Sequence, residues 1–217
     1  MAVPIHNREQ YDDAVEFVHQ DDFLLVVNKP AGMLAVPGRG ADKQDCLSAS
    51  VRRLFPDTLI VHRLDMATSG LMVFARGLGM QRRLSRLFQD RKVDKRYVAL
   101  VTGKMGQEAG EIAWPLIADW PNRPRQKVDH MNGKPALTRF RVLSYDKLTD
   151  ITRLELQPVT GRTHQLRVHL MSFGHAIMGD LLYQGPAASR LMLHASALDF
   201  AHPVSGVPME LRSNTPF

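Results

Sequence analysis

The sequence has a single cysteine, Cys46, and contains no long hydrophobic run. One cysteine excludes an intrachain disulfide and a metal cluster built from several thiolates. No apolar stretch approaches the length of a membrane-spanning helix, and residues 1–9 lack the apolar core of a secretory signal peptide. We therefore expect a cytoplasmic protein that has no membrane partner.

Signature motifs of several enzyme classes are missing as well. The chain has no Walker motif, no dinucleotide fingerprint, no HExxH zinc motif and no Gly-x-Ser-x-Gly nucleophile elbow. His164, His169 and His175 lie close in sequence, but the spacing of the first two does not place them on one helix face, as a zinc pair requires. We expect no metal and no organic cofactor.

Acidic residues become scarce after the first 22 positions. Residues 1–22 hold six acidic residues and one basic residue, whereas residues 23–217 hold 27 basic and 16 acidic residues, a net charge of +11. A basic body favours a polyanionic partner such as nucleic acid, although it can also serve solubility alone. We interpret residues 1–22 as an acidic N-terminal extension and residues 23–217 as a single domain, because no boundary resembles a flexible linker.

The apolar pattern predicts a mixture of strands and helices. Strands are expected at residues 23–28, 71–75, 97–101, 138–142 and 152–156, and a strand or helix start at 191–195. Helices are expected at residues 42–55, 78–91 and 163–173, the last of them capped by Thr163. Residues 103–135 are expected to be mostly irregular. Because strands and helices do not alternate strictly, the pattern favours the α+β class.

The most informative segment is HRLDMATSG, residues 62–70, which places Asp65 in a loop that enters an apolar strand. A buried carboxylate needs a cation, and Arg63 and Arg167 are the candidates. Loops held by a rigid scaffold often carry catalytic groups. From the residues alone, Asp65 is either a member of a structural ion pair, which is the more common case, or a catalytic acid held by its partner.

Three other segments allow both a functional and a structural interpretation. In TGRTHQLR, residues 160–167, a helix start with free N–H groups could hold a phosphate, or it is simply a capped helix with solvated basic residues. Tyr97 is either a core tyrosine or a platform on which a base stacks. Residues 119–127, which mix a tryptophan, two prolines and three basic residues, form either a rigid surface loop or an RNA-contacting loop.

Taken together, these segments resemble the RluA family of pseudouridine synthases. The resemblance extends over residues 23–208 and rests on motifs in a fixed order: NKPAG (28–32), HRLDMATSG (62–70), KRYVA (95–99), TGRTHQLRVH (160–169), Gly179-Asp180 with Tyr183, and LMLHA (191–195). The 119–127 segment is most similar to the members that modify both tRNA and 23S rRNA. Two positions depart from the family pattern: Ala176 replaces the usual proline and Gln184 the usual glycine.

The resemblance implies an α+β pseudouridine synthase fold, in which helices flank a mixed, mostly antiparallel central sheet with a central basic cleft and no S4 domain. It implies an isomerase that acts on RNA, not DNA, as a monomer without an obligate protein partner. The expected target uridines are uridine-32 in tRNA anticodon stem-loops and uridine-746 in 23S rRNA. A non-catalytic RNA-binding protein on the same scaffold, or a nuclease using His164, His169 and carboxylates, would be the alternatives.

The resemblance also implies roles for individual residues. Asp65 would be the essential carboxylate, acting as a nucleophile or as a base, with Arg167 as its partner. Tyr97 would stack on the uracil and assist proton removal at C5. Leu64 and Leu193 would form an apolar wall, and Arg63 would fill the space left by the extruded uridine. Further RNA contacts are expected from His62, Arg162, His164, Arg123, Arg125 and Lys127.

Overall fold

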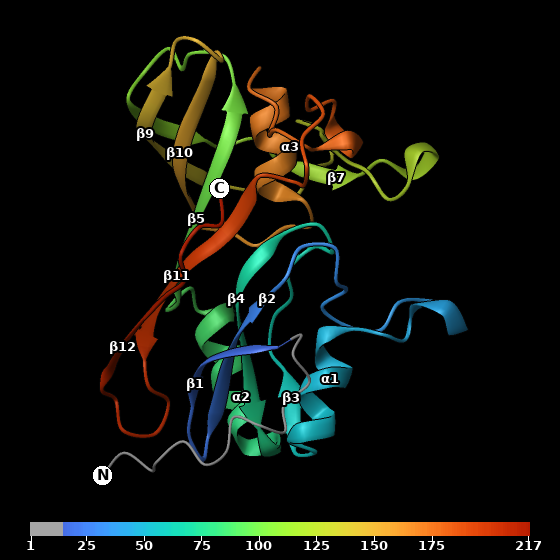
Figure 1. Cartoon of the computed structure of the whole chain (residues 1–217), viewed down its shortest axis with the longest axis vertical. Coiled ribbons are helices and arrows are strands. Elements are labelled where there is room, and N and C mark those ends of the chain that lie inside the picture. The colour runs from blue at the N-terminus through green and yellow to red at the C-terminus, as the bar shows by residue number, and fades with distance from the viewer. Residues whose placement is uncertain (1–14) are drawn as a thin grey trace.

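The computed structural model describes residues 15–217, and a ten-stranded sheet extends along most of this part of the chain (Figure 1). The strand order is β1-β2-β4-β11-β5-β10-β9-β6, with β3 added to β4 and β12 added to β11. Among the described strands, only β4 and β11 pair in parallel, so the predicted mixed, mostly antiparallel α+β fold is confirmed.

The elements have the following bounds. The strands of the large sheet are β1 (Glu16–Gln20), β2 (Leu24–Lys29), β3 (Thr58–Ile60), β4 (Ser69–Arg76), β5 (Asp94–Thr102), β6 (Ala109–Ile112), β9 (Thr138–Asp146), β10 (Ile151–Pro158), β11 (Leu193–Ala201) and β12 (Pro208–Arg212). A separate two-stranded sheet joins β7 (Leu116–Ala118) to β8 (Gln126–Val128). The helices are α1 (Leu47–Leu54), α2 (Gly77–Gln89) and α3 (Gln165–Ser172), with short 3-10 helices η2 (Ala41–Lys43), η3 (Trp120–Asn122) and η4 (Leu181–Tyr183).

In the N-terminal half, strands β2 and β4 are covered on both faces. Leu24 and Val26 of β2 pack in the cluster that contains Leu84 of α2, whereas Leu25 and Val27 pack in the cluster that contains α1. Burial on both faces explains why these strands are continuous apolar runs rather than alternating ones.

In the C-terminal half, apolar and polar residues alternate along strands β9 and β10 because only one face of these strands is covered. Leu154 and Leu156 of β10 join Phe140 of β9 and α3 in one core cluster. On the opposite face, the exposed Arg141 and the half-buried Glu155 form an ion pair of 2.9 Å. The period of two in the sequence therefore identifies the buried face.

Strand β11 connects the two halves. Its pairing with β4 consists of two residue pairs, His194 with Ser69 and Ala195 with Gly70. Gly70 has a φ of +114°, and a Cβ there would lie 2.3 Å from the carbonyl oxygen of Ala195. Only glycine allows so close an approach of the two backbones, and this approach holds the end of the Asp65 loop against β11.

Several predicted boundaries are wrong. The predicted N-terminal extension is not separate, because β1 pairs with β2 in the sheet; residues 1–14, with the rest of its acidic residues, lie outside the described residues. The helix predicted at 42–55 begins only at Leu47, after an extended Cys46. Residues 103–135 are mostly irregular, as predicted, but they also contain β6, β7, η3 and β8, each of three or four residues. Strands so short and so interrupted by proline and glycine give no detectable period.

The start of α3 also differs from the prediction. Thr163 does not cap the helix; the N-cap is His164, whose backbone is in the left-handed region with a φ of 53°. The side chain of Gln165 instead receives the N–H of Arg162 at 3.0 Å. At the other end, Gly174, with a φ of +94°, follows the helix as predicted. No helix in the described part of the chain is long and apolar enough to cross a membrane.

Candidate active site

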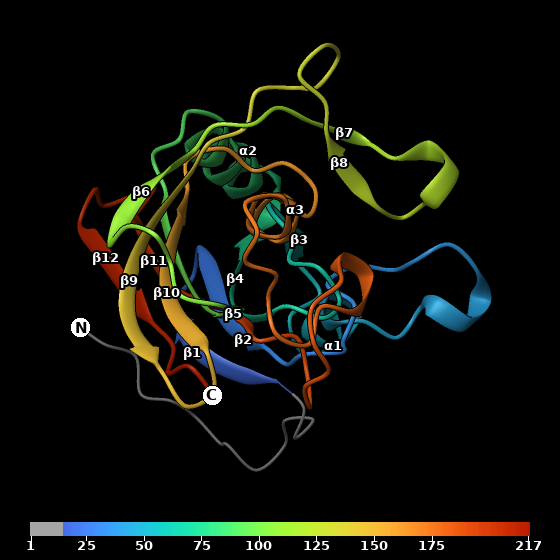
Figure 2. The same cartoon turned by 90° about the horizontal axis from the view of Figure 1, so that it is seen from above.

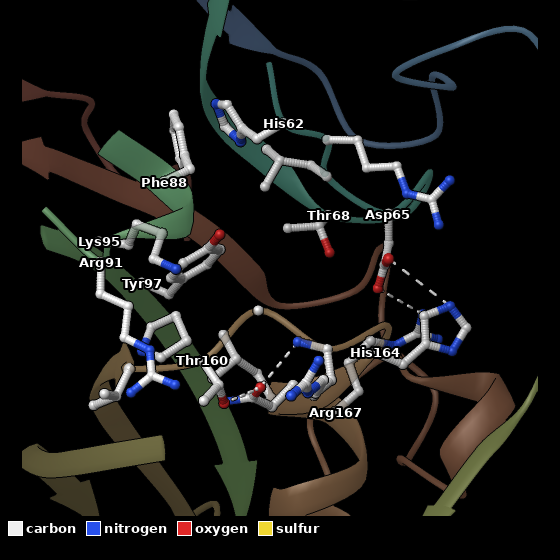
Figure 3. A pocket seen from close by; sticks show the side chains of 18 of the residues that line it. His62, Asp65, Thr68, Phe88, Arg91, Lys95, Tyr97, Thr160, His164 and Arg167 are labelled. Atoms are coloured by element: carbon white, nitrogen blue, oxygen red, sulfur yellow. Dashed lines mark hydrogen bonds and ion pairs between the residues drawn. The ribbon is translucent and has the colours of Figure 1, made fainter. Parts of the chain in front are cut away.

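A cavity of about 690 Å³ lies where the core clusters of the two halves meet. Its lining includes residues of the loop before β4, the end of α2, the start of β5 and the start of α3 (Figure 3). Five basic residues and one acid, Asp65, line it. The volume falls within the range of ligand pockets in general.

Asp65 lies in the loop between β3 and β4, as the sequence predicts, and its side chain is 28 % exposed. The loop closes with a hydrogen bond from the N–H of Thr68 to the carbonyl of Asp65 at 3.1 Å. The N–H of Gly32 binds the carbonyl of Met66 at 2.9 Å. These backbone contacts hold the carboxylate at the edge of the cavity.

Arg167 is the cation that pairs with Asp65. Its Nη1 is 3.3 Å from Asp65 Oδ2, while its Nε and Nη2 are both 2.7 Å from the two oxygens of Asp180. Burial acts to lower the pKa of Arg167, but the hydrogen bond and charge of Asp180, followed by Asp65, outweigh it and raise the pKa. The bidentate contact with Asp180 fixes the guanidinium plane and thereby its third nitrogen at Asp65.

A second cation, Lys29, supports the Asp65 loop from inside the protein. Lys29 is fully buried, and its Nζ donates to the carbonyls of Pro30, Met33 and Met66 at 2.8, 2.7 and 3.0 Å. Burial lowers the pKa of Lys29 to about 8, and the charge of Asp65 opposes that shift. Lys29 therefore anchors the loop through all three of its ammonium hydrogens.

His164 approaches Asp65 from the start of α3. Its Nδ1 is 2.7 Å from the hydroxyl of Tyr183, and its Nε2 is 3.8 Å from Asp65 Oδ1. The Tyr183 hydroxyl accepts the N–H of Gln126 at 2.8 Å, so its own hydrogen is directed at His164 Nδ1. Burial lowers the pKa of His164, with Asp65 opposing that effect. A neutral imidazole in this tautomer turns its Nε2–H toward the carboxylate.

The apolar part of the cavity is formed by Tyr97, Leu64 and Leu193. Leu64 and Leu193 are 7 % and 3 % exposed and line the cavity. Tyr97 packs against the core clusters of both halves. Burial, and secondly the charge of Asp65, raise the pKa of Tyr97, so the phenol form is favoured over the phenolate.

The remaining predicted contacts divide into two groups. Arg63, His62 and Arg162 line the cavity. Arg63 is exposed and forms no ion pair among the described residues, whereas Arg162 donates to the carbonyl of Pro135 at 3.1 Å. The ring of His62 stacks on Phe88 at 4.5 Å, and its Nε2 accepts the N–H of Val73 at 3.0 Å. Burial lowers the pKa of His62 to about 3, so this ring contributes no charge at neutral pH.

Arg123, Arg125 and Lys127 are not brought to the cavity. They belong to the β7–β8 hairpin, which projects from the body of the molecule (Figure 2). The guanidinium of Arg123 lies 3.2 Å from the ring centre of the exposed Trp120. Through the hydrogen bond of Gln126 to Tyr183, the base of this hairpin is connected to His164.

Several residues of the site carry no role in the sequence prediction. Lys29, Asp180 and Tyr183 lie within the motifs, yet only their contacts reveal that they hold Asp65, Arg167 and His164. The signal in the sequence is a charged residue inside or beside apolar runs, as at Lys29. Gln184 has a φ of +61°, which explains why the family favours glycine there. Among the described residues, no group of three or more His, Cys, Asp or Glu side chains is placed to hold a metal ion.

Comparison with known proteins identifies the family of the chain. The family model for RNA pseudouridylate synthase matches residues 23–172. The dual-specificity RNA pseudouridine synthase RluA of Yersinia pestis is 47 % identical over 204 residues, 92 % of this chain and 98 % of that protein. RluA of Escherichia coli strain K12 is 45 % identical, over 92 % of this chain and 93 % of that protein.

A solved structure, human RNA pseudouridylate synthase domain containing 1, superimposes with a TM-score of 0.78 at 30 % identity, covering 94 % of this chain and 84 % of that one. The chain belongs to the RNA pseudouridylate synthase family. Within that family it falls in the RluA group, like the two bacterial relatives.

Proposed function

We propose that this protein is an RNA pseudouridine synthase, an isomerase that converts specific uridines in structured RNA to pseudouridine. The observation that carries the proposal is the Asp65 carboxylate, held by Arg167 at the edge of a cavity that also contains Tyr97. We further propose that residues 15–217 form a single catalytic domain, which acts in the cytoplasm as a monomer on RNA, without a metal or cofactor.

The reaction breaks the N1–C1′ bond of the uridine, turns the uracil and joins C5 to C1′; C5 releases its proton and N1 takes up one, so the product is an isomer of the substrate. Asp65 acts either as a nucleophile on an electrophilic carbon or as a base on the ribose. Both roles place a carboxylate beside cations, and Arg167 contacts Asp65 directly while Lys29 holds its loop. Leu64 and Leu193 exclude water from the reacting atoms.

Tyr97 supports the uracil by stacking. Its raised pKa makes the phenolate rare, which argues for contact with the base through the ring and against the phenolate as the group that removes the C5 proton. Because the chemistry requires an extruded uridine, Arg63 has the task of holding the RNA open. Its side chain is exposed, lines the cavity and has no ion pair within residues 15–217, which supports that role.

We propose two substrates for this chain: tRNA, at uridine-32 of the anticodon stem-loop, and 23S rRNA, at uridine-746. The relatives that carry the name dual-specificity RNA pseudouridine synthase match nearly the whole chain. Arg123, Arg125 and Lys127 on the β7–β8 hairpin supply positive charge outside the cavity for RNA beyond the target nucleotide.

The test is release of tritium from RNA labelled at uridine C5, with wild-type protein and Asp65→Asn. Wild type should release tritium from tRNA and 23S rRNA, and the variant should be slower by at least about 10³-fold because its amide can neither attack nor accept a proton. Asp65→Asn should still bind RNA within a few-fold of wild type.

Two outcomes oppose the proposal. Pure wild-type protein that releases no tritium from either RNA would leave the non-catalytic RNA-binding alternative. Strand cleavage in the same reactions would instead indicate a nuclease that uses His164 and His169. Mapping the modified uridines in active reactions decides between one substrate and two.

A further inference from the structure

The charges that line the cavity are not evenly distributed. Asp65, His164 and Arg167 occupy one side, where each has an ionic or hydrogen-bonded partner. Arg91 and Lys95 occupy the other side, next to Tyr97 (Figure 3). Within residues 15–217, neither Arg91 nor Lys95 has a side-chain ion pair or hydrogen bond.

Arg91 stands at a backbone position that usually belongs to glycine. Helix α2 ends in a Schellman motif, in which the N–H of Lys92 binds the carbonyl of Leu87 at 2.8 Å and that of Arg91 binds Phe88 at 3.3 Å. Arg91 therefore has a φ of 57°, a conformation that is unfavourable for a residue with a Cβ. Such strain is often retained where a side chain serves a function.

Lys95 is the less exposed member of this pair. It lies on β5, two residues before Tyr97, and its side chain lines the cavity. Burial lowers the pKa of Lys95, and the charge of Arg91 lowers it further, against a weaker opposing effect of Asp94. Asp94 does not line the cavity, so Arg91 and Lys95 face the cavity together and attract an anion.

We propose that Arg91 and Lys95 form a phosphate-binding site, which takes one backbone phosphate beside the extruded uridine and so places the uracil against Tyr97. This inference rests on the proposed function and adds a specific subsite to it. The side of the cavity with Arg91 and Lys95 binds the RNA backbone, while the side with Asp65 carries out the chemistry. The site is distinct from the general basic surface because its two cations line the cavity itself.

The first test compares Arg91→Gly with wild type. Glycine removes the cation and relieves the left-handed strain, so the midpoint of thermal unfolding should stay the same or rise by about 2–4 °C. The KM for substrate RNA should rise roughly tenfold with kcat within a factor of two, because a charge-assisted contact is lost. The slope of log affinity against log salt should decrease by about 0.7–0.9. Lys95→Met should raise KM in the same way.

Two control variants separate charge from backbone effects. Gln184→Gly relieves the same strain, at a φ of 61° and outside the cavity lining, and should change stability alone. Arg82→Ala removes an exposed cation of α2 that does not line the cavity, and should change KM less than twofold. If Arg82→Ala weakens binding as much as Arg91→Gly does, the site is only general surface charge and the proposal is wrong.

The decisive experiment uses RNA in which a single neutral methylphosphonate replaces one phosphate near the target uridine. At one of the substituted phosphates, the methylphosphonate should lower the kcat/KM of wild type roughly tenfold. The same RNA should not lower the kcat/KM of Arg91→Gly any further, because the methylphosphonate and the substitution remove the same contact. Equal losses for both proteins at every position would overturn the proposal. Failure of wild type to make pseudouridine in unmodified RNA would instead overturn the proposed function.

Discussion

The position of Arg167 depends on a residue that never touches the cavity. Asp180 is 1 % exposed and binds two nitrogens of the guanidinium, which leaves the third for Asp65. Removing one member of a buried ion pair leaves a buried charge without compensation, at a cost of about 3–5 kcal/mol. Asp180 is therefore a positioning residue for the Asp65–Arg167 pair.

We expect Asp180→Asn to lower kcat roughly 100-fold with little change in the KM for RNA, since a displacement of about 1 Å at the reacting group has that effect. Urea denaturation should show a loss of stability as well. Asp199→Asn is the matched control, because Asp199 pairs with the more exposed Arg212 and Arg96 and surface pairs contribute only about 0–1 kcal/mol. Full kcat in a destabilised Asp180→Asn would mean a purely structural role.

Asp65 could be singled out from the sequence because a charge beside a buried strand requires a partner. That argument left Arg63 and Arg167 as candidates, and the family resemblance selected Arg167. The roles of Lys29 and Asp180 could not be predicted. Lys29 binds backbone carbonyls, which carry no sequence signal, and Asp180 acts through Arg167, whose other partner, Asp65, is far away in the sequence. Arg91 was missed for a different reason. A left-handed arginine looks like an ordinary residue of a basic helix until the backbone is known.

At the scale of elements, the contact between β4 and β11 depends on the absence of a side chain at Gly70. Gly70→Ala should destabilise the protein by about 2–4 kcal/mol, because its Cβ would meet the backbone of Ala195 and its φ of +114° is left-handed. Gly79→Ala, inside α2 with nothing within 4 Å of the added Cβ, should stabilise it by about 0.5–1 kcal/mol. Chemical denaturation of both variants measures these changes in stability. Equal changes for the two variants would contradict the close approach of the Gly70 and Ala195 backbones.

The strongly patterned elements were predicted closely, and the weakly patterned ones were not. Helix α2 lies within two residues of its predicted bounds, since one face of it is regularly apolar. The strands between residues 103 and 135 escaped notice because they are held by tertiary pairing, as β6 is by β9. At the start of α3, the contact of His164 with Tyr183 takes precedence over the capping preference of Thr163.

At the scale of the whole molecule, buried histidines should make folding sensitive to acid. Burial, and secondly the charge of Arg190, lower the pKa of His194 from 6.5 to about 4. The unfolded state then takes up a proton below pH 6.5 that the folded state takes up only near pH 4. Stability contributed by neutral His194 is therefore complete above pH 6.5 and is lost as the pH falls toward 4, by up to about 1.4 kcal/mol per pH unit.

His194→Gln should test this directly. At pH 7 the variant should be less stable by about 1–3 kcal/mol, because it loses the hydrogen bonds of His194 to Ser69 and Ser213. Urea denaturation at a series of pH values should show the two stability curves converging toward pH 4. Curves that remain parallel between pH 6.5 and 4 would contradict a lowered pKa of His194.

The place of β11 in the sheet has a consequence for synthesis on the ribosome. Asp65 and Tyr97 emerge early, yet the strand that lies between β4 and β5 is translated only at residues 193–201. Until then the nascent chain has two open strand edges, which are prone to aggregate, and its long-range pairings favour slow folding. The catalytic centre is thus among the last features to be completed, so a ribosome that stalls before residue 193 should release an inactive chain.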